Sequence, residues 1–333
     1  MNKRTESSFL PAWWLRSPHL QTLWPVFFRR RPHLPLQAER VELADGDFID
    51  LAHYPRPDSP LVLVIHGLEG SVDSHYAQTL MQALHEEGFA SVFMHLRGRS
   101  QTPNRLPRSY HSGLTSDIAE VLAHLQQSGR MPDAAVGFSL GGNLILKYLG
   151  ETGKDSGLKT AVAVSVPFQL QECARKLESG FARVYGLHLV NRLKRTYRDK
   201  FSRMPSPLTV DVSKLKTLFE FDDRITAPLN GFADAEDYYR RSSSAQFLRS
   251  IQTPTLIIHA KDDPFMHPTT APSEDMLSDS VTLELAAHGG HVGFISGSLP
   301  WQAEYWLEPR IIAWLRTNLP PKTPHTKQRN TPA

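Results

Sequence analysis

The stretch Ala134–Leu149 reads AAVGFSLGGNLILKYL and contains the pentapeptide GFSLG at residues 137–141. Its apolar start, Ala134–Gly137, predicts a buried strand, and Asn143–Leu149 predicts a helix. A G-x-S-x-G sequence between a strand and a helix forms a sharp turn that presents the serine hydroxyl above a sheet. Glycines fit both flanks because such a turn brings backbones too close together for a side chain. We therefore predict Ser139 as a nucleophile, with the N-terminus of the following helix favouring negative charge beside it.

Strands and helices alternate on both sides of this stretch. A hairpin is predicted at Arg40–Leu43 and Phe48–His53, around the turn Asp45-Gly46. Apolar runs and helical spacing predict the remaining elements: strands at Leu61–Ile65, Ala90–Met94, Thr160–Val164, Thr255–His259 and Val281–Leu285, and helices at Tyr76–Glu87, Leu114–Gln126 and Glu304–Leu319. This alternation predicts an α/β fold with a mostly parallel central sheet and helices on both faces.

Residues 169–247 interrupt the alternation. They are rich in Arg, Lys, Tyr and Phe, contain no convincing buried strand, and are too long for a bare connection. We predict a mainly helical cap or lid inserted there, with the α/β core at 36–168 and 248–319. Residues 1–35 are an N-terminal arm rich in aromatic and basic side chains. Residues 320–333 contain four prolines and are expected to be disordered.

Composition narrows the function classes. The 333 residues are 40% hydrophobic and 21% charged, a globular balance. A formal charge of +3 gives no strong attraction to nucleic acid, so no nucleic-acid partner is expected. No apolar run has the length of a signal peptide or of a membrane helix. The single cysteine, Cys173, excludes an intramolecular disulfide and fits a reducing compartment, so we expect a cytoplasmic protein.

The arm allows two interpretations. Trp13, Trp14, Trp24, Arg29 and Arg30 place aromatic rings beside arginines, a combination that can anchor a peripheral protein at a lipid surface. Alternatively, the arm folds back and packs on the core, because the three prolines between residues 11 and 31 spoil a clean amphipathic helix. The sequence leaves both open.

The stretch IHGLEG at residues 65–70 follows the apolar run LVLVI. Acyl transfer through a serine needs two backbone N–H donors for the oxyanion, one of them from the residue after the nucleophile. Leu140 occupies that position, and the glycine-flanked turn can present the N–H of Leu68 as the second donor. We interpret His66 as a brace for this loop rather than as a catalytic group.

A serine hydroxyl also needs a base, and the base needs an acid that holds its tautomer. Two aspartates follow a predicted strand, and a histidine between glycines follows 28 residues later, which gives the chain order Ser, Asp, His. We predict the triad Ser139, Asp263 and His291. Asp262 and His288 remain alternatives: Asp263 is preferred for its place past the strand, and His291 for its glycine-rich loop. No metal-ligand spacing such as HExxH occurs, and neither a metal nor an organic cofactor is expected.

The sequence resembles the YheT-like branch of the α/β hydrolases, which are relatives of the eukaryotic abhydrolase-domain lipases and of yeast ethyl-ester acyltransferases. The resemblance covers nearly the whole chain and rests on HLQT at 19–22, HGLEGS at 66–71, MHLRG at 94–98, GFSLGGN at 137–143, FDDRITAPLNGF at 221–232, DYY at 237–239, DDPF at 262–265 and GGHVGF at 289–294. It implies the α/β-hydrolase fold, a triad of Ser139, Asp263 and His291, and carboxylesterase or acylglycerol-lipase-like activity.

These observations together predict a serine hydrolase whose partner is a small-molecule acyl ester. The substrate is expected to be a short- to medium-chain carboxylic ester or an acylglycerol, cleaved through an acyl-enzyme intermediate. The cap aromatics Phe181, Tyr185, Tyr197 and Phe201 either line an apolar acyl pocket or form the core of the cap. Two alternatives stay open: acyl transfer to an alcohol on the same site, and a non-catalytic lipid- or ligand-binding protein. The oligomeric state is not predicted.

Overall fold

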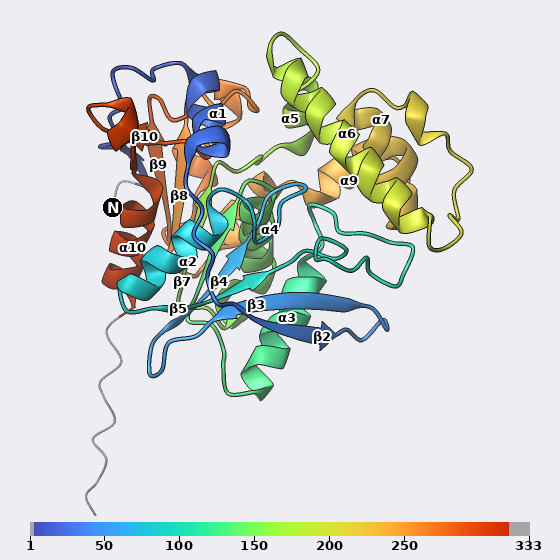
Figure 1. Cartoon of the computed structure of the whole chain (residues 1–333), viewed down its shortest axis with the longest axis horizontal. Helices are drawn as coiled ribbons and strands as arrows, with labels where there is room; N and C mark the ends of the chain where they lie inside the picture. Colours follow the sequence, from blue (N-terminus) through green and yellow to red (C-terminus); the bar gives the residue numbers. More distant parts are fainter. Residues whose placement is uncertain (1–2, 320–333) are drawn as a thin grey trace, which may run out of the picture.

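A computed structural model describes residues 3–319 and contains a nine-stranded central sheet (Figure 1). The strand order is β1-β9-β8-β7-β6-β4-β5-β3-β2. Strand β3 pairs antiparallel with β2 and β5, and every other neighbouring pair is parallel. The predicted α/β fold with a mostly parallel sheet is confirmed. The tail at 320–333, which the sequence predicts to be disordered, lies outside the described residues.

The bounds of the elements agree closely with the sequence in the core. The strands are β1 (Arg4–Glu6), β2 (Gln37–Glu42), β3 (Phe48–Tyr54), β4 (Leu61–Ile65), β5 (Ala90–Met94), β6 (Ala134–Phe138), β7 (Thr160–Val164), β8 (Thr255–Ala260) and β9 (Val281–Ala286), with a separate pair β10 (Ile295–Ser296) and β11 (Glu304–Tyr305). The main helices are α1 (Pro18–Phe28), α2 (Ala77–Glu86), α3 (Thr115–Gln127), α4 (Leu140–Thr152), α5 (Leu170–Lys176), α6 (Ala182–Phe201), α7 (Leu218–Phe221), α8 (Ala227–Leu229), α9 (Ala235–Ser242) and α10 (Leu307–Asn318). Strands β4, β5 and β7 have the predicted bounds.

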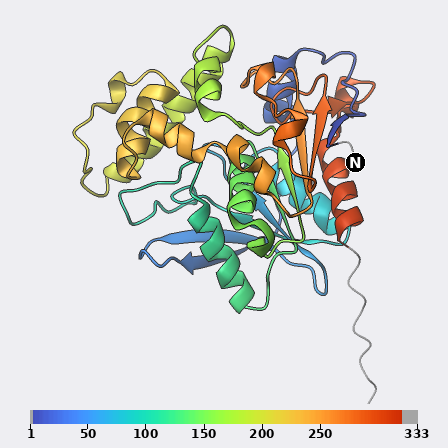
Figure 2. The same ribbon diagram turned by 180° about the vertical axis from the view of Figure 1, so that it is seen from behind.

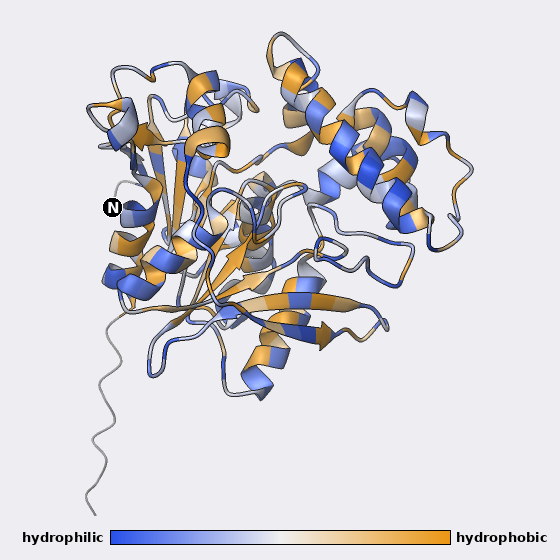
Figure 3. Cartoon of the chain, viewed as in Figure 1, coloured by the Kyte–Doolittle hydropathy of each residue, from blue (hydrophilic) through white to orange (hydrophobic). Residues whose placement is uncertain are grey.

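The two faces of the sheet are covered by different helices, because successive side chains of a strand point to opposite faces. In β4, Val62 and Val64 belong to a hydrophobic cluster that includes residues of α2 and α10. Leu63 and Ile65 belong to the cluster that includes residues of α3 and α4. Figure 2 shows the molecule from behind, and Figure 3 shows that the central strands are hydrophobic along most of their length. The apolar runs of the sequence are therefore strands buried on both faces, as expected for parallel sheets.

The ends of two helices differ from the sequence prediction. Helix α4 begins at Leu140 rather than at Asn143, because Ser139 itself is the N-cap residue. Helix α10 begins at Leu307 rather than at Glu304, because the preceding residues pair with β10 as a short strand. The N-cap at Ser139 and the strand pairing of Glu304 are backbone features that the spacing of apolar residues does not show.

The arm is more ordered than its prolines indicate. Pro18 is the first residue of α1, a position where the missing N–H leaves no bond unmade, and Pro25 lies within the helix. Ahead of it, β1 adds an edge strand parallel to β9, with Arg4 opposite Leu283. The prolines therefore do not prevent a helix here, although the sequence analysis expects them to spoil a clean amphipathic one. The arm folds back onto the core, and α1 lies beside the strand pair β10–β11 in Figure 1.

Between β7 and β8 the described chain contains helices and turns but no strand. This segment runs from α5 to α9, followed by the 3₁₀ helix η4 (Ser244–Ser250), and its helices project from one end of the core (Figure 1). It has its own small hydrophobic clusters, one around Tyr185 and Tyr238 and one around Phe221. A π-helical turn, η3 (Asp222–Thr226), interrupts it.

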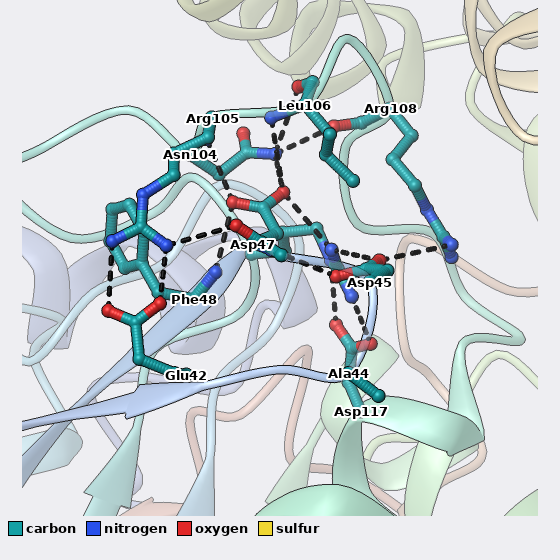
Figure 4. Close-up of polar contacts among 12 residues, drawn as sticks. Glu42, Ala44, Asp45, Asp47, Phe48, Asn104, Arg105, Leu106, Arg108 and Asp117 are labelled. Carbon is teal, nitrogen blue, oxygen red and sulfur yellow. Dashed lines mark hydrogen bonds and ion pairs between the residues drawn. The ribbon is translucent and has the colours of Figure 1, made fainter.

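A buried ion-pair network fixes the loop that follows β5. The Arg97 side chain is 1% exposed and donates to Asp117 of α3 at 2.7 and 3.1 Å and to Asp47 at 3.0 Å. Asp47 in turn accepts from the Asn104 side chain at 2.6 Å and from the Arg105 N–H at 2.8 Å (Figure 4). These bonds pull the loop between Arg97 and α3 down onto the β2–β3 turn. That loop borders the cavity described below.

Candidate active site

Ser139 occupies the sharp turn between β6 and α4. Its backbone has φ 53° and ψ −118°, a strained conformation for a residue with a side chain. A Cβ added at Gly137 would come within 2.4 Å of the Gly141 carbonyl oxygen, and one added at Gly141 within 2.5 Å of the Ile65 carbonyl oxygen. The two flanking glycines are therefore required by close backbone approach, as the sequence predicts.

The structure brings the three predicted triad residues together. The His291 Nε2 atom is 3.0 Å from Ser139 Oγ, and its Nδ1 atom is 2.8 Å from Asp263 Oδ2. The Asp263 side chain is 1% exposed, and its other oxygen accepts the Phe265 N–H at 2.9 Å. A carboxylate can only accept, so Nδ1 carries the imidazole proton and Nε2 is left to accept from the Ser139 hydroxyl.

The alternative pair lies next to this one but is not aimed at the serine. Asp262 Oδ2 is 3.1 Å from Nδ1 of His288, whose side chain is half exposed. Its Oδ1 atom accepts the Gly290 N–H at 3.0 Å. Asp262 thus braces the loop that carries His291, and no bond joins His288 to Ser139.

The two candidate oxyanion donors lie beside Ser139. Leu140 is the first residue of α4, so its N–H belongs to the group that has no acceptor within the helix. In the β4–α2 loop, the N–H groups of Gly67 and Glu69 donate to tyrosine hydroxyls at 3.0 and 2.8 Å. The Leu68 N–H between them pairs with no acceptor within residues 3–319. Gly67 passes so close to Ser139 that an added Cβ would be 3.1 Å from the serine Cβ.

His66 braces this loop from inside, as the sequence analysis expects. Its Nδ1 atom is 2.7 Å from the Gly67 carbonyl oxygen, and its Nε2 atom accepts the Leu96 N–H at 3.0 Å. Burial lowers the pKa of His66 to about 3, so the ring stays neutral with one donor and one acceptor nitrogen. Each nitrogen has a backbone partner, and His66 therefore holds the turn in place.

Glu69 ties the same loop to the segment above it. Its buried carboxylate accepts from Tyr110 at 3.0 Å and from Thr196 of α6 at 2.7 Å, and it pairs with Arg99 at 3.1 Å. Its carbonyl oxygen accepts from Arg192 of α6 at 2.6 Å. The motif HGLEGS therefore includes a carboxylate, that of Glu69, which fixes α6 over the candidate oxyanion site.

A cavity of about 920 Å³ opens above Ser139 and His291. Its walls come from the core loops, from α1, and from the helices between β7 and β8. All four cap aromatics named in the sequence analysis border it, namely Phe181, Tyr185, Tyr197 and Phe201. Tyr185 also belongs to a buried cluster of the cap, so the two interpretations of these residues are compatible. Cys173 borders the cavity as well, and burial raises the pKa of its thiol to about 12, which leaves it an unreactive small apolar group.

The arm residues that the sequence assigns to a lipid surface divide into two sets. Trp13 and Arg30 are exposed, although the Trp13 indole donates to the Ser298 carbonyl at 2.9 Å. The Trp14 indole donates to the Gly297 carbonyl at 3.2 Å and packs against Trp24 with ring centroids 4.8 Å apart. Arg29 pairs with Glu308 of α10. Trp14, Trp24 and Arg29 therefore attach the arm to the core, and none of the helices within residues 3–319 is long and apolar enough to cross a bilayer.

Four residues that contact the His291 loop were not identified as site residues from sequence. Phe265 stacks on the His291 ring with centroids 4.0 Å apart and planes 5° from parallel. The Ser165 hydroxyl accepts the Val292 N–H at 3.1 Å, and Gln21 and Thr22 of α1 bond the same loop. Phe265 and the α1 pair lie in the motifs DDPF and HLQT, which are the signals that could have found them. Ser165 has no comparable signal.

Comparisons with known proteins give the following likenesses. The profile of the family described as alpha/beta hydrolase fold matches residues 60–298. An Escherichia coli K12 protein named "Putative esterase YheT" is 45% identical over 327 residues, which cover 96% of each chain. Phospholipase ABHD3 of Mus musculus is 29% identical over 311 residues, covering 90% of this chain and 76% of that protein. The structure of the Pyrococcus furiosus esterase Pf2001 has a TM-score of 0.56 at 14% identity and covers 87% of this chain and 98% of its own, a likeness of fold.

Proposed function

The chain belongs to the α/β hydrolase fold family, as its motifs predict, and on that premise we propose that it is a serine hydrolase that cleaves carboxylic esters. The observation that carries the proposal is the continuous bond path from Asp263 through His291 to Ser139, at 2.8 and 3.0 Å. The names of two relatives, an esterase and a phospholipase, point to the same bond type. A protein that only binds a ligand has no need of an activated serine.

In the proposed mechanism, His291 Nε2 takes the Ser139 proton as Oγ forms a bond to the acyl carbon. The carbonyl electron pair moves onto oxygen, and the N–H groups of Leu68 and Leu140 stabilise that charge. The pair returns, the bond to the alcohol oxygen breaks, and His291 protonates the leaving alcohol. Water then attacks the acyl-enzyme by the same route and releases the acid and free Ser139. Asp263 stays ionised throughout and stabilises the imidazolium.

We propose that residues 169–247 act as the cap over this site, on a core formed by 36–168 and 248–319. The cavity borders on Leu170, Leu177 and Leu189 as well as the cap aromatics, which favours an apolar acyl chain over a charged one. Short- to medium-chain esters and acylglycerols are the proposed substrates. Transfer of the acyl group to an alcohol uses the same acyl-enzyme and differs only in the second acceptor.

The deciding experiment is labelling with a fluorophosphonate probe, which reacts only with an activated serine. We expect the wild type to be labelled, and Ser139→Ala and His291→Ala to be unlabelled although folded. A series of nitrophenyl esters of increasing acyl length then shows which chain lengths the pocket accepts. Absence of labelling in a folded wild type, with no ester of the series turned over, contradicts the proposal and favours the ligand-binding alternative.

A peripheral lipid contact is proposed at the mouth of the cavity. Phe27 and Phe28 of α1 and Phe181 and Val184 of the cap are exposed, and three of these four residues border the cavity. Arg30 follows α1 and is exposed as well. Aromatic rings with adjacent arginines suit the headgroup region of an anionic bilayer. This surface replaces the set of five residues proposed from sequence, because three of those five face the core.

Flotation with vesicles that contain an anionic lipid tests this contact. We expect the wild type to float with the vesicles, and the double variant Phe27→Ser, Phe181→Ser to remain in the protein fraction. Trp301 is the matched control, since it is 76% exposed and does not border the cavity. Equal flotation of the double variant and of Trp301→Ser contradicts a lipid contact at the mouth of the cavity.

A further inference from the structure

The loop that carries His291 is held in a conformation that it would not adopt alone. Between Gly289 and Ile295, Gly290 has φ 59°, Val292 φ 57° and Phe294 φ 49°. A positive φ is rare for a residue with a side chain and is most unfavourable for a β-branched one such as Val292. Such a loop persists only where its surroundings fix it at several points, so the groups that fix it determine where the imidazole lies.

One fixing point is Thr22 in α1. Its hydroxyl donates to the Pro18 carbonyl one turn earlier at 2.7 Å. Because the hydroxyl has only one proton, its lone pairs are free to accept, and they accept the backbone N–H of His291 at 2.9 Å. This bond joins a helix of the arm directly to the backbone of the candidate base, 269 residues away in the sequence.

The second fixing point is Gln21, which is completely buried. Its amide oxygen accepts the Ile295 N–H at 2.7 Å, and its amide nitrogen donates to the Ile295 carbonyl at 2.9 Å and to the Leu15 carbonyl at 2.8 Å. The side chain therefore pairs with both backbone groups of Ile295, as a neighbouring strand would. Thr22 and Gln21 thus hold the loop at His291 and at its C-terminal end.

The backbone of α1 also lies directly against the loop. A Cβ added at Gly290 would come within 2.5 Å of the Pro18 carbonyl oxygen, and one added at Gly293 within 2.3 Å of the Gln21 carbonyl oxygen. Pro25 has no N–H, so the Gln21 carbonyl lacks its usual partner in the helix. The glycines next to His291 therefore serve close contact with the arm, in addition to their backbone conformation.

We propose that Gln21 and Thr22 are positioning residues for His291, so that the N-terminal arm is a structural part of the active site. The inference rests on the proposed function, because it assigns them to the placement of that reaction's base. The bond from the His291 N–H to Thr22 fixes the position of His291 relative to Ser139 and Asp263. The bonds of Gln21 to Ile295 hold the C-terminal end of the strained loop in place. A displacement of the imidazole by a fraction of an ångström weakens both bonds of the triad and slows the reaction.

The test compares Thr22→Val, which keeps the shape but removes the acceptor, with Thr22→Ser, which keeps it. We expect Thr22→Val to lower kcat and the fluorophosphonate labelling rate by about tenfold to one hundredfold, with KM within about twofold of wild type. Thr22→Ser should restore both rates to within about threefold. Thr317→Val is the matched control, because Thr317 donates to a carbonyl one turn earlier at 3.0 Å in α10, is exposed and does not border the cavity.

Gln21→Glu provides a second, independent variant if Thr22→Val folds poorly. The substitution keeps the size but replaces the amide nitrogen, so that a carboxylate oxygen would face two carbonyl oxygens. We expect the same loss in kcat and in labelling rate, measured well below the unfolding midpoint of each variant. Loss of activity in Thr317→Val as well, or wild-type rates in both Thr22→Val and Gln21→Glu, overturns the inference while leaving the proposed function intact. An unlabelled wild type, in contrast, overturns the proposed function first.

Discussion

Replacing Asp263 by asparagine isolates the role of the acid, because the side chain keeps its size and loses only its charge. In the wild type, one oxygen of Asp263 accepts the Phe265 N–H and the other accepts from His291 Nδ1. An asparagine keeps its carbonyl oxygen on the Phe265 N–H, which turns the amide NH₂ group toward His291. Nδ1 must then accept, the imidazole proton moves to Nε2, and Nε2 can no longer take the proton of Ser139.

The magnitude follows from the loss of the correct tautomer. We expect kcat for a nitrophenyl ester to fall on the order of 10⁴-fold in Asp263→Asn, with a much smaller change in KM. Residual activity remains because the oxyanion donors and substrate binding are untouched. We expect circular dichroism and thermal unfolding to show a folded variant, since the Phe265 bond is retained.

Asp262→Asn is the matched control, one residue away in the same turn. Its amide oxygen can still accept the Gly290 N–H, and the bond that changes is the one to the half-exposed His288. We expect kcat to fall by less than about tenfold. Equal losses in the two variants, or a larger loss in Asp262→Asn, would refute the assignment of Asp263 as the acid and with it the tautomer argument.

Two further predictions concern stability. Burial raises the pKa of Asp222 to about 6, so the folded state retains a proton that the unfolded chain has released, and the unfolding free energy falls as pH rises from about 4 to about 6. Asp222→Asn should remove this loss, which is at most about 3 kcal/mol, in urea titrations at both ends of that range. Arg97→Met leaves the buried carboxylates of Asp117 and Asp47 without their guanidinium partner and should lower the unfolding free energy by about 3–5 kcal/mol in the same titration; a change below about 1 kcal/mol contradicts the network.

The turn that presents Ser139 and the central strands could be predicted because their signals are local. Residues 134–149 contain the strand, the turn and the helix that present Ser139, and three apolar runs have the same bounds as observed strands. The approach of the three candidate triad residues could be predicted for the same reason, since each follows its own strand. The choice between Asp262 and Asp263 was weaker, because two adjacent residues differ only in the direction of their side chains.

The contacts that complete the site could not be predicted, because they join residues far apart in sequence. Gln21 bonds Ile295 across 274 residues, and Ser165 bonds Val292 across 127. The prolines of the arm predicted that no clean amphipathic helix would form there. Helix α1 nevertheless forms, because Pro18 is at its first position and tertiary contacts hold the remaining turns. Helix propensity is a weak guide for a segment such as α1, because tertiary contacts can override it.

The distribution of backbone strain explains why those distant contacts exist. Six non-glycine residues between positions 3 and 319 have positive φ, and five of them lie in the site: Glu69, Ser139, Ser165, Val292 and Phe294. Strain of this kind persists only where the surroundings over-determine the backbone. Around Glu69 the fixing groups come from α6 and from Tyr110 and Arg99, and around Val292 they come from α1 and Ser165. The arm and the cap therefore do more than cover a finished site, because α1 and α6 supply part of the bonds that hold the strained loops beside Ser139.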